Sequence, residues 1–363
     1  MNHSSSSLPK LLFVIADSSR SGAPRQVLTL MKGLGDAYRL ALACPEGWLA
    51  DEAKKLRADV FILPPTRFKS INFLKKIYTE TKPDLIHCHG VRGGVLGLFA
   101  IGSSTKVPPV LYTEHTWTED FPMTSKVRKS AHIFLLRTLL QKATKVIAVS
   151  KAVESFFTHH HIVPASKIHV IYGGVASCPE VEPTDKPVIG MLGSLVKVKG
   201  IDLLLQALAL LRRSYPDVRC KIGGTGKDIF SFQYLAHKLK IDRMVEWVGE
   251  VQDPHDFFEQ IRVFVQPSWS EAFGLSVLEA MACGIPVIVS RTGGLKEIVE
   301  DNENGLTFPK GEINVLASQL ELLLHDQQLY EKLSQKGRER AALFSIERML
   351  QNHREVYQQL LQK

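Results

Sequence analysis

Two glutamates, Glu271 and Glu279, stand eight residues apart in the stretch EAFGLSVLEAMACGIPVIVSRTGG (residues 271–294). An ionised carboxylate accepts two hydrogen bonds at once, so it suits the neighbouring hydroxyls of a sugar. Gly274 allows a turn before a helical pattern, and the backbone N–H groups near Leu275 at the start of that helix favour a phosphate. Glu279 inside the helix suits a ribose, and Glu271 in the preceding loop suits a polyol beyond the phosphates. The stretch therefore predicts a site for a nucleotide-sugar.

Glycine-rich segments occur at three further points, residues 18–25, 193–200 and 223–228. None has the spacing GxGxxG or GxxxxGK[ST], so neither a dinucleotide fingerprint nor a Walker loop is indicated. Lys199 stands beside Gly200, just before a helical pattern, where its ammonium group would meet an anion held at the start of that helix. The alternative interpretation of Lys199 is a solvated surface lysine.

Short apolar runs alternate with helical patterns along most of the chain. This alternation is typical of parallel β-sheets covered by helices on both faces. In the first half the predicted strands lie at residues 11–19, 39–45, 58–64, 83–90, 108–115 and 145–150. In the second half they lie at residues 187–193, 218–224, 245–249, 263–268 and 286–292, and two C-terminal helices follow.

Between the two series lies the segment 176–187, ASCPEVEPTDKP, which is rich in proline and acidic residues and has no periodicity. We interpret it as an interdomain linker. The chain is therefore predicted to be an α/β protein with two Rossmann-like, doubly wound parallel-sheet domains that face each other across a cleft. In such sheets ligands bind beyond the C-terminal ends of the strands, so every loop that follows a strand is a candidate wall of the site.

The composition, 45% hydrophobic and 23% charged, is that of a folded, water-soluble protein. No apolar run approaches the roughly 18 residues of a membrane span, and residues 1–9 are interpreted as a polar, disordered lead without the apolar core of a signal peptide. The five cysteines are scattered and never spaced CxxC, which favours buried free thiols in a reducing cytoplasm over disulfides or a zinc site. We therefore expect a cytoplasmic protein.

Positive charge is concentrated in the first half of the chain. Residues 1–176 hold 23 Lys and Arg against 12 Asp and Glu, whereas residues 177–363 hold 22 against 25. An anionic partner is therefore expected, either a membrane surface or a phosphorylated acceptor, with nucleic acid disfavoured. Residues 67–76 and 126–145 mix basic with apolar side chains, as helices that lie on anionic lipid do. The same pattern also fits core helices with a basic outer face.

The run from residue 271, continued by GGLKEIV (293–299), resembles the E-x7-E region of the retaining glycosyltransferases of family 4. Other segments fall in that family's order from about residue 10 onward: SGAPRQVL (21–28), PDLIHCHG (83–90), YTEH (112–115), GSLVKVKG (193–200) and FSIERMLQNHREVY (344–357). The resemblance implies the GT-B fold. Residues 10–175 would then be the acceptor-side domain, 176–187 the linker, 188–344 the nucleotide-sugar-binding domain, and 345–363 a helix that crosses back to the first domain.

The resemblance also implies roles for single residues. Glu279 would bind the ribose, Glu271 and His115 would contact the donor sugar, Lys199 would neutralise the diphosphate, and Gly22 would let the first glycine loop close over it. Gly293 and Gly294 would shape the floor of the pocket, with Glu297 in support. The predicted catalytic residues are Glu271, His115 and Lys199. The predicted donor-binding residues are Gly22, Ser194, Lys197, Lys199, Glu271, Ala272, Phe273, Gly274, Leu275 and Glu279.

Two positions depart from the family pattern. The family usually has an arginine where this chain has Ser194, and a serine cannot supply a forked cation to a diphosphate. Lys197 or Arg25 could compensate. The family often has Asn-Gly where this chain has Gly173 and Gly174, so the polar contact of the asparagine is missing.

The implied activity is that of a retaining, metal-independent hexosyltransferase. It would move a hexose-type sugar from a nucleotide-diphosphate-sugar to an acceptor such as a cell-envelope glycan, a lipopolysaccharide or a lipid-linked saccharide. The donor's own phosphate would take the acceptor's proton, while Lys199 and helix N-termini stabilise the diphosphate. No cofactor and no metal are expected, and the protein would be cytoplasmic, in peripheral contact with the inner face of the membrane. Glu271 and Glu279 straddle a phosphate-type helix end, which argues against a glycosidase.

Several alternatives stay open at this point. The alternative function is a catalytically weak or inactive nucleotide-sugar-binding protein docked on membranes, which Ser194 would favour, and a nucleotide-sugar epimerase is a weaker third. His115 could be a packed or capping histidine. His87 and His89 alternate on a predicted strand, as metal ligands can, but have no apparent third ligand. The triplet at residues 159–161 favours a solvated helix end over a site.

Overall fold

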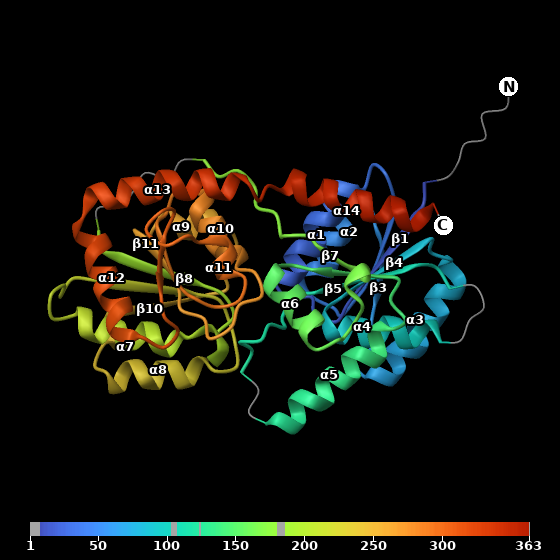
Figure 1. Cartoon of the computed structure of the whole chain (residues 1–363), viewed down its shortest axis with the longest axis horizontal. Helices are drawn as coiled ribbons and strands as arrows, with labels where there is room; N and C mark the ends of the chain where they lie inside the picture. The colour runs from blue at the N-terminus through green and yellow to red at the C-terminus, as the bar shows by residue number, and fades with distance from the viewer. Residues whose placement is uncertain (1–7, 103–106, 123–124, 180–185, 363) are drawn as a thin grey trace. The chain divides into compact units, whose positions relative to one another are not determined.

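Two parallel β-sheets organise the part of the chain that the computed structural model describes, residues 8–102, 107–122, 125–179 and 186–362 (Figure 1). Each sheet belongs to its own compact unit. The first unit draws on Met1–Trp117, Met123–Tyr172 and Glu347–Lys363, and the second on Thr118–Pro122 and Gly173–Ile346. Residues 1–7 of the predicted lead and 180–185 of the predicted linker lie outside the described residues.

In the described residues of the first unit, seven parallel strands follow the order β3-β2-β1-β4-β5-β6-β7. Every residue of β4 and β5 is buried, as expected for strands covered by helices on both faces, and the buried set includes the polar residues His87, His89, Thr113 and Glu114. The chain winds outward in both directions from β1 and β4, so the C-terminal ends of these two strands adjoin a topological switch point. The strands are β1 (Lys10–Ile15), β2 (Arg39–Cys44), β3 (Asp59–Ile62), β4 (Leu85–His89), β5 (Val110–Glu114), β6 (Lys145–Ala148) and β7 (Ile168–Val170).

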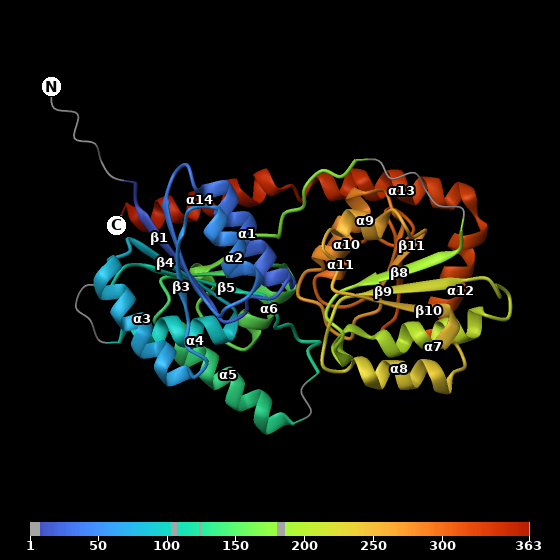
Figure 2. The same cartoon turned by 180° about the vertical axis from the view of Figure 1, so that it is seen from behind.

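Helices cover both faces of this sheet, with α1, α2 and α14 on one face and α3, α4 and α5 on the other (Figures 1 and 2). Helix α14 packs on α1, where Leu350 lies directly over Gly33 and Arg354 donates to the Gly33 carbonyl oxygen at 2.6 Å. The helices are α1 (Gly22–Leu34), α2 (Trp48–Lys55), α3 (Arg67–Thr81), α4 (Gly90–Ile101), α5 (Lys126–Leu140), α6 (Lys151–His159) and α14 (Ile346–Leu361).

The second unit repeats the scheme with six described parallel strands in the order β10-β9-β8-β11-β12-β13. Its switch point lies between β8 and β11. The strands are β8 (Val188–Leu192), β9 (Arg219–Gly223), β10 (Val245–Gly249), β11 (Val263–Gln266), β12 (Val287–Ser290) and β13 (Leu306–Phe308). The prediction of two Rossmann-like parallel sheets is confirmed.

Helices also sandwich the second sheet. The core between the sheet and α7, α8 and α12 contains Leu204, Phe232 and Leu320, while α10 and α13 pack together on the opposite face (Figure 1). The helices are α7 (Ile201–Leu211), α8 (Ile229–Lys238), α9 (Pro254–Phe258), α10 (Leu275–Ala282), α11 (Leu295–Ile298), α12 (Ile313–His325) and α13 (Gln327–Ala342). The prediction of two C-terminal helices was wrong, because Asp326 accepts the Leu329 N–H at 2.9 Å and separates α12 from α13, ahead of α14.

Two of the five cysteines are paired, so the expectation of free thiols throughout was wrong. Cys178, ahead of β8, forms a disulfide with Cys283 at the C-terminal end of α10. Because the two residues are 105 positions apart, no local spacing could indicate this bond. Cys44, Cys88 and Cys220 are free and buried. Burial raises the pKa of the Cys44 thiol to about 11 and that of Cys88 to about 12.

No helix in the described ranges combines the length and the apolar character needed to cross a bilayer.

Candidate functional site

An ion pair at the switch point of the second unit joins two of the predicted site residues. The Nζ atom of Lys199, in the loop after β8, lies 2.7 Å from Oε2 of Glu271, in the loop after β11. Their side chains are 23% and 12% exposed, so solvent screens this pair less than a surface pair. Ser268 Oγ also donates to Glu271 Oε2, at 3.2 Å. Residues 72 positions apart in the sequence thus share one polar cluster.

Gly200 lets the two loops approach this closely. Its backbone is left-handed, with φ of 70°, and a Cβ atom there would collide with the Pro267 carbonyl group. The Trp269 N–H donates to the Val198 carbonyl oxygen at 2.8 Å. The loop that carries Lys199 is therefore fastened to the loop that carries Glu271 through the backbone.

A second tight contact holds the backbone of Glu271. The Gly294 N–H donates to the Glu271 carbonyl oxygen at 2.9 Å, and a Cβ atom on Gly293, where φ is 43°, would collide with the same oxygen. Gly293 and Gly294 thus support the loop that carries Glu271. The contacts seen here are made by the backbone, and a role of the two glycines toward a ligand stays a prediction.

Sequence reasoning missed Thr118 and Asp120, which belong to the second unit and reinforce the same loops. Asp120 Oδ2 accepts the Gly293 N–H at 3.0 Å, and its Oδ1 lies 3.0 Å from Lys310 Nζ. Burial alone would raise the pKa of Asp120, but the Gly293 N–H and Lys310 lower it overall. Thr118 Oγ1 lies 2.9 Å from Ser270 Oγ, next to Glu271. No motif marks either residue in the sequence.

The helix that follows Glu271 begins as the sequence predicts. Gly274, with φ of 109°, is the N-cap of α10, and as a glycine it has no side chain to cap the first turn. The N–H groups near Leu275 are therefore available to an anion. Glu279 lies half-buried on the same helix. Ala272 and Phe273, also predicted donor-binding residues, are buried in the turn before it.

The two glycine-rich segments of the second unit lie side by side. The Leu195 N–H donates to the Thr225 carbonyl oxygen at 2.9 Å, and the Lys197 N–H donates to Asp228 Oδ2 at 3.0 Å. Ser194 is half-buried in this turn and Lys197 is exposed. The long, exposed side chain of Lys197 can therefore reach farther toward a ligand than the short side chain of Ser194.

A pocket of about 1050 Å³ opens at the C-terminal edge of the sheet in the first unit. The loops after β1, β3, β4 and β5 line it, so it occupies the switch point of that sheet. Of the predicted residues, His115 lines the pocket, while Gly22 is the neighbour of its lining residue Ala23. The lining residues used below are Asp17, Arg67, His89, Arg92, His115 and Trp117.

His115 is held in the pocket wall from two sides. Its Nε2 atom lies 3.0 Å from Nδ1 of His89, and the Glu114 carboxylate accepts the His115 N–H at 2.9 Å and the Thr116 N–H at 2.8 Å. Burial lowers the pKa of His115 to about 3, so the imidazole is neutral near pH 7. Glu114 is buried, which raises the pKa of its carboxyl group. Sequence reasoning missed Glu114 as the residue that orients this turn.

The alternation of His87 and His89 serves packing and hydrogen bonding. Their rings face the same side of β4, with centroids 4.0 Å apart. His87 Nδ1 lies 2.7 Å from the Tyr357 hydroxyl and its Nε2 lies 2.7 Å from Thr113 Oγ1, so both ring nitrogens of His87 are already engaged. His353 of α14 lies beside them and was not predicted. This arrangement argues against the metal interpretation of His87 and His89.

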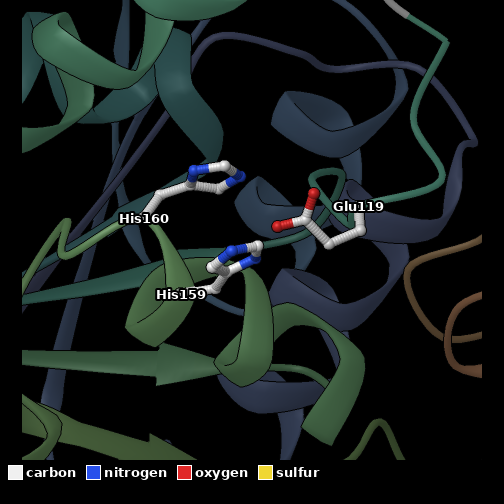
Figure 3. A group of neighbouring side chains, drawn as sticks. All are labelled: Glu119, His159 and His160. Carbon is white, nitrogen blue, oxygen red and sulfur yellow. The ribbon is translucent and has the colours of Figure 1, made fainter.

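Another group of His, Asp and Glu side chains among the described residues has donor atoms close enough together to hold a metal ion. His255, Asp256 and Glu259, on and next to the short helix α9, offer one donor atom each within 4.8 Å of one another, but two of the three are exposed. His159 and His160 lie at the C-terminal end of α6, with stacked rings 4.8 Å apart (Figure 3), as expected for a helix end. The third residue drawn there, Glu119, belongs to the other compact unit.

Comparison with known proteins covers nearly the whole chain. The family model "Glycosyltransferase Family 4" matches residues 20–177, and "Glycosyl transferases group 1" matches residues 178–340. An uncharacterized glycosyltransferase of Haemophilus influenzae is 32% identical over 161 residues, which is 44% of this chain and about half, 46%, of that protein. The O-antigen biosynthesis glycosyltransferase WclY of Escherichia coli is 24% identical over 98% of this chain and 99% of its own length.

The fold has solved counterparts. Anabaena HepE, crystallised in complex with UDP-glucose, aligns over 96% of this chain and 99% of its own with a TM-score of 0.83, at 21% identity. At that identity the likeness concerns the fold.

Proposed function

Because the chain belongs to the family 4 glycosyltransferases and has their GT-B fold, we propose that it transfers a hexose-type sugar from a nucleotide-diphosphate-sugar to a saccharide or lipid-linked acceptor of the cell envelope, with retention at the anomeric carbon. The observation that carries this proposal is the Lys199–Glu271 pair beside the uncapped start of α10. The O-antigen relative favours a cell-envelope glycan, and the UDP-glucose complex of HepE favours a UDP-sugar donor.

The donor would lie with its diphosphate between Lys199 and the first turn of α10. A lysine ammonium group and free helix N–H groups both favour an anion and would stabilise the charge that develops when the nucleotide leaves. Glu279, on the same helix, would accept hydrogen bonds from the ribose hydroxyls. Glu271 would keep its ion pair with Lys199 and also accept a hydrogen bond from a sugar hydroxyl, since a carboxylate has more than one acceptor site.

In the proposed reaction the bond between the anomeric carbon and the phosphate oxygen breaks, and the acceptor oxygen bonds to the same face of that carbon. The acceptor's hydroxyl proton passes to the leaving phosphate oxygen, so no protein nucleophile is needed. Lys199 and the start of α10 supply the positive charge, which is our reason for proposing a metal-independent reaction. His115 is neutral and could hydrogen-bond a sugar hydroxyl without adding charge.

Exposed basic and apolar side chains on α3 and α5 of the first unit support contact with an anionic membrane. Phe68 on α3 is 75% exposed, and Val127 and Phe134 on α5 are 77% and 69% exposed. Both helices also carry exposed arginines or lysines, such as Lys69 and Arg137. Such a mixture lies stably at a lipid surface with negative headgroups. It also fits the alternative function, a membrane-docked protein that binds nucleotide-sugar without efficient transfer.

The test is thermal stabilisation of the purified protein by UDP, GDP, ADP and dTDP, with and without their sugars. A ligand that binds only the folded state stabilises it, by about 2.7 kcal/mol at a hundred times its Kd. We expect one nucleotide to raise the Tm, Glu279→Ala to remove the effect, and Glu303→Ala, at an exposed position of the same unit, to preserve it. No response to any nucleotide at millimolar concentration would contradict the proposed function.

A further inference from the structure

Two arginines of the pocket in the first unit have no partner in the described part of the chain. Arg67 is the first residue of α3, and Arg92 lies in the first turn of α4. Both line the pocket, both side chains are exposed, and neither makes an ion pair or a hydrogen bond with any described residue. A guanidinium group offers five N–H donors in a planar fork that matches a phosphate. The pocket therefore holds two free phosphate-type donors.

The helices that carry these arginines add to the positive potential. The pocket is lined by the first turns of α3, which has 15 residues, and α4, which has 12. Neither helix has an acidic residue in its first turn or a side-chain N-cap, so their first N–H groups are available. The positive ends of both helix dipoles then act on the same space.

Asp17 is the acidic residue among the lining residues, and its single negative charge does not balance the two arginines. Asp17 is engaged locally, because its carboxylate accepts the Ser19 N–H at 2.9 Å and the Ser21 hydroxyl at 2.8 Å. His89 is 2% exposed and lines the pocket, and its Nε2 atom has no hydrogen-bond partner among the described residues. A buried polar atom without a partner is costly, so a ligand atom in the pocket would relieve it.

We propose that this pocket binds a phosphate group carried by the acceptor, with Arg67 and Arg92 as its ligands and the acceptor's sugar toward His89, His115 and Trp117. The inference rests on the proposed function, because it names the chemical class of the acceptor. The donor's diphosphate is a separate anion in that scheme, since Lys199 and the start of α10 belong to the second unit. The phosphate could come from a lipid-linked saccharide or from a soluble sugar phosphate.

The experiment is calorimetric titration of the full-length protein with glucose 1-phosphate, hexyl phosphate and unphosphorylated glucose. All titrations use a Lys199→Gln background, which weakens anion binding at the predicted donor site. Arg67→Gln and Arg92→Gln should each weaken glucose 1-phosphate binding about tenfold, and the double variant about a hundredfold, as expected for the loss of charge-assisted hydrogen bonds. Arg39→Gln is the matched control, because Arg39 is exposed at the opposite, N-terminal edge of the same sheet.

The proposal is supported if phosphate binding weakens in the Arg67 and Arg92 variants and is unchanged in the Arg39 control. Tighter binding of hexyl phosphate than of glucose 1-phosphate would then point to a lipid-linked acceptor, and the reverse order to a soluble one. Equal binding of glucose and glucose 1-phosphate, or undiminished binding in the double variant, would overturn it. Titration of the unmodified protein with UDP tests the proposed function separately, since a protein that binds UDP but no phosphate in this pocket loses only the acceptor assignment.

Discussion

At the scale of single residues, Lys199 and Glu271 are the strongest candidates for chemistry. Their side chains are within hydrogen-bond distance and mostly buried, and the glycines at 200, 293 and 294 leave the surrounding backbone little room to relax. A carboxylate already engaged by an ammonium group is fixed in orientation before a ligand arrives. Such preorganisation is what a site must have if it is to stabilise developing charge.

We expect Glu271→Gln to lower kcat at least about a hundredfold, because an amide cannot replace a carboxylate as a charged acceptor for the donor sugar. UDP binding should persist, since Lys199 and the start of α10 remain. Steady-state kinetics and UDP titration of the same preparation would separate the two effects. Glu303→Gln is the control, and transfer at the unmodified rate in Glu271→Gln would remove this residue from the mechanism.

The buried histidines make stability depend on pH. Burial lowers the pKa of His87, His89, His115 and His353, to about 3 for His115 and about 4 for His353. In the unfolded chain these pKa values return to about 6.5, so below that pH the unfolded state binds protons that the folded state does not. The free energy of unfolding should therefore fall as the pH drops below about 6.5, by up to about 1.4 kcal/mol per pH unit for each histidine.

Urea denaturation between pH 7.5 and 4.5 measures this slope. His353→Leu should reduce it by the share of one histidine, because one proton fewer is taken up on unfolding. His237→Leu, at an exposed position of α8, is the control. Identical slopes in the unmodified protein and His353→Leu would show that His353 takes up no proton on unfolding.

At the scale of elements, two features depend on contacts between elements: the packing of α14 on α1 in the first unit, and the pairing of one short edge strand in each sheet. Strands β7 and β13 have three residues each and were not predicted, because three residues are too short to show a period. Each pairs on one side only, at the edge of its sheet. Pairing with a neighbouring strand, which only the folded chain provides, defines them.

The contact of Leu350 with Gly33 predicts a size-dependent coupling between α14 and α1. A Cβ atom at Gly33 would collide with the Leu350 side chain, so Gly33→Ala should cost about 1–3 kcal/mol of unfolding free energy. Leu350→Ala should cost about 2–4 kcal/mol by leaving a cavity. In the double variant the new methyl group has room, so the combined loss should be smaller than the sum.

Urea unfolding of the four proteins gives the coupling energy. Gly35→Ala is the control, because a Cβ atom there would make only ordinary contacts, at 3.6 Å or more. Strictly additive losses would mean that α14 does not rest on Gly33 in solution.

At the scale of the whole molecule, the excess of positive charge in the first half has two structural expressions. One is the pocket with Arg67 and Arg92, and the other is the set of exposed basic and apolar side chains on α3 and α5. We expect the protein to bind vesicles more strongly as their anionic lipid content rises, and less strongly at high salt, because exposed charges are screened. Phe134→Asp should weaken binding, since it places a like charge at the lipid surface.

Vesicle co-sedimentation with neutral and with anionic lipid measures this binding. The control is Phe230→Asp in the second unit, where the aromatic side chain is 81% exposed. Binding that is indifferent to anionic lipid, or equal weakening by both substitutions, would count against a membrane surface on the first unit.

The sequence alone determined the features that depend on local pattern. Short, mostly apolar runs between helical patterns predicted two parallel sheets, because a strand covered on both faces is mostly apolar. The E-x7-E stretch and Lys199 were predicted as site residues from local pattern as well, since a glycine turn, a helix start and the nearby charges all lie within a few positions of one another. The family and its fold followed from these motifs in their order along the chain.

Only the tertiary structure decided what depends on residues distant in the chain. The Cys178–Cys283 bond, the support of Gly293 by Asp120 over 173 positions, and the hydrogen bond of His87 with Tyr357 over 270 positions have no local signal. The meeting of Arg67 and Arg92 in one pocket is of the same kind. Arg67 and Arg92 meet because parallel strands bring their C-terminal ends, and the loops that follow them, to one edge of a sheet. The disulfide, ahead of β8, and the bond from β4 to α14 instead depend on how helices and connections pack around the sheets.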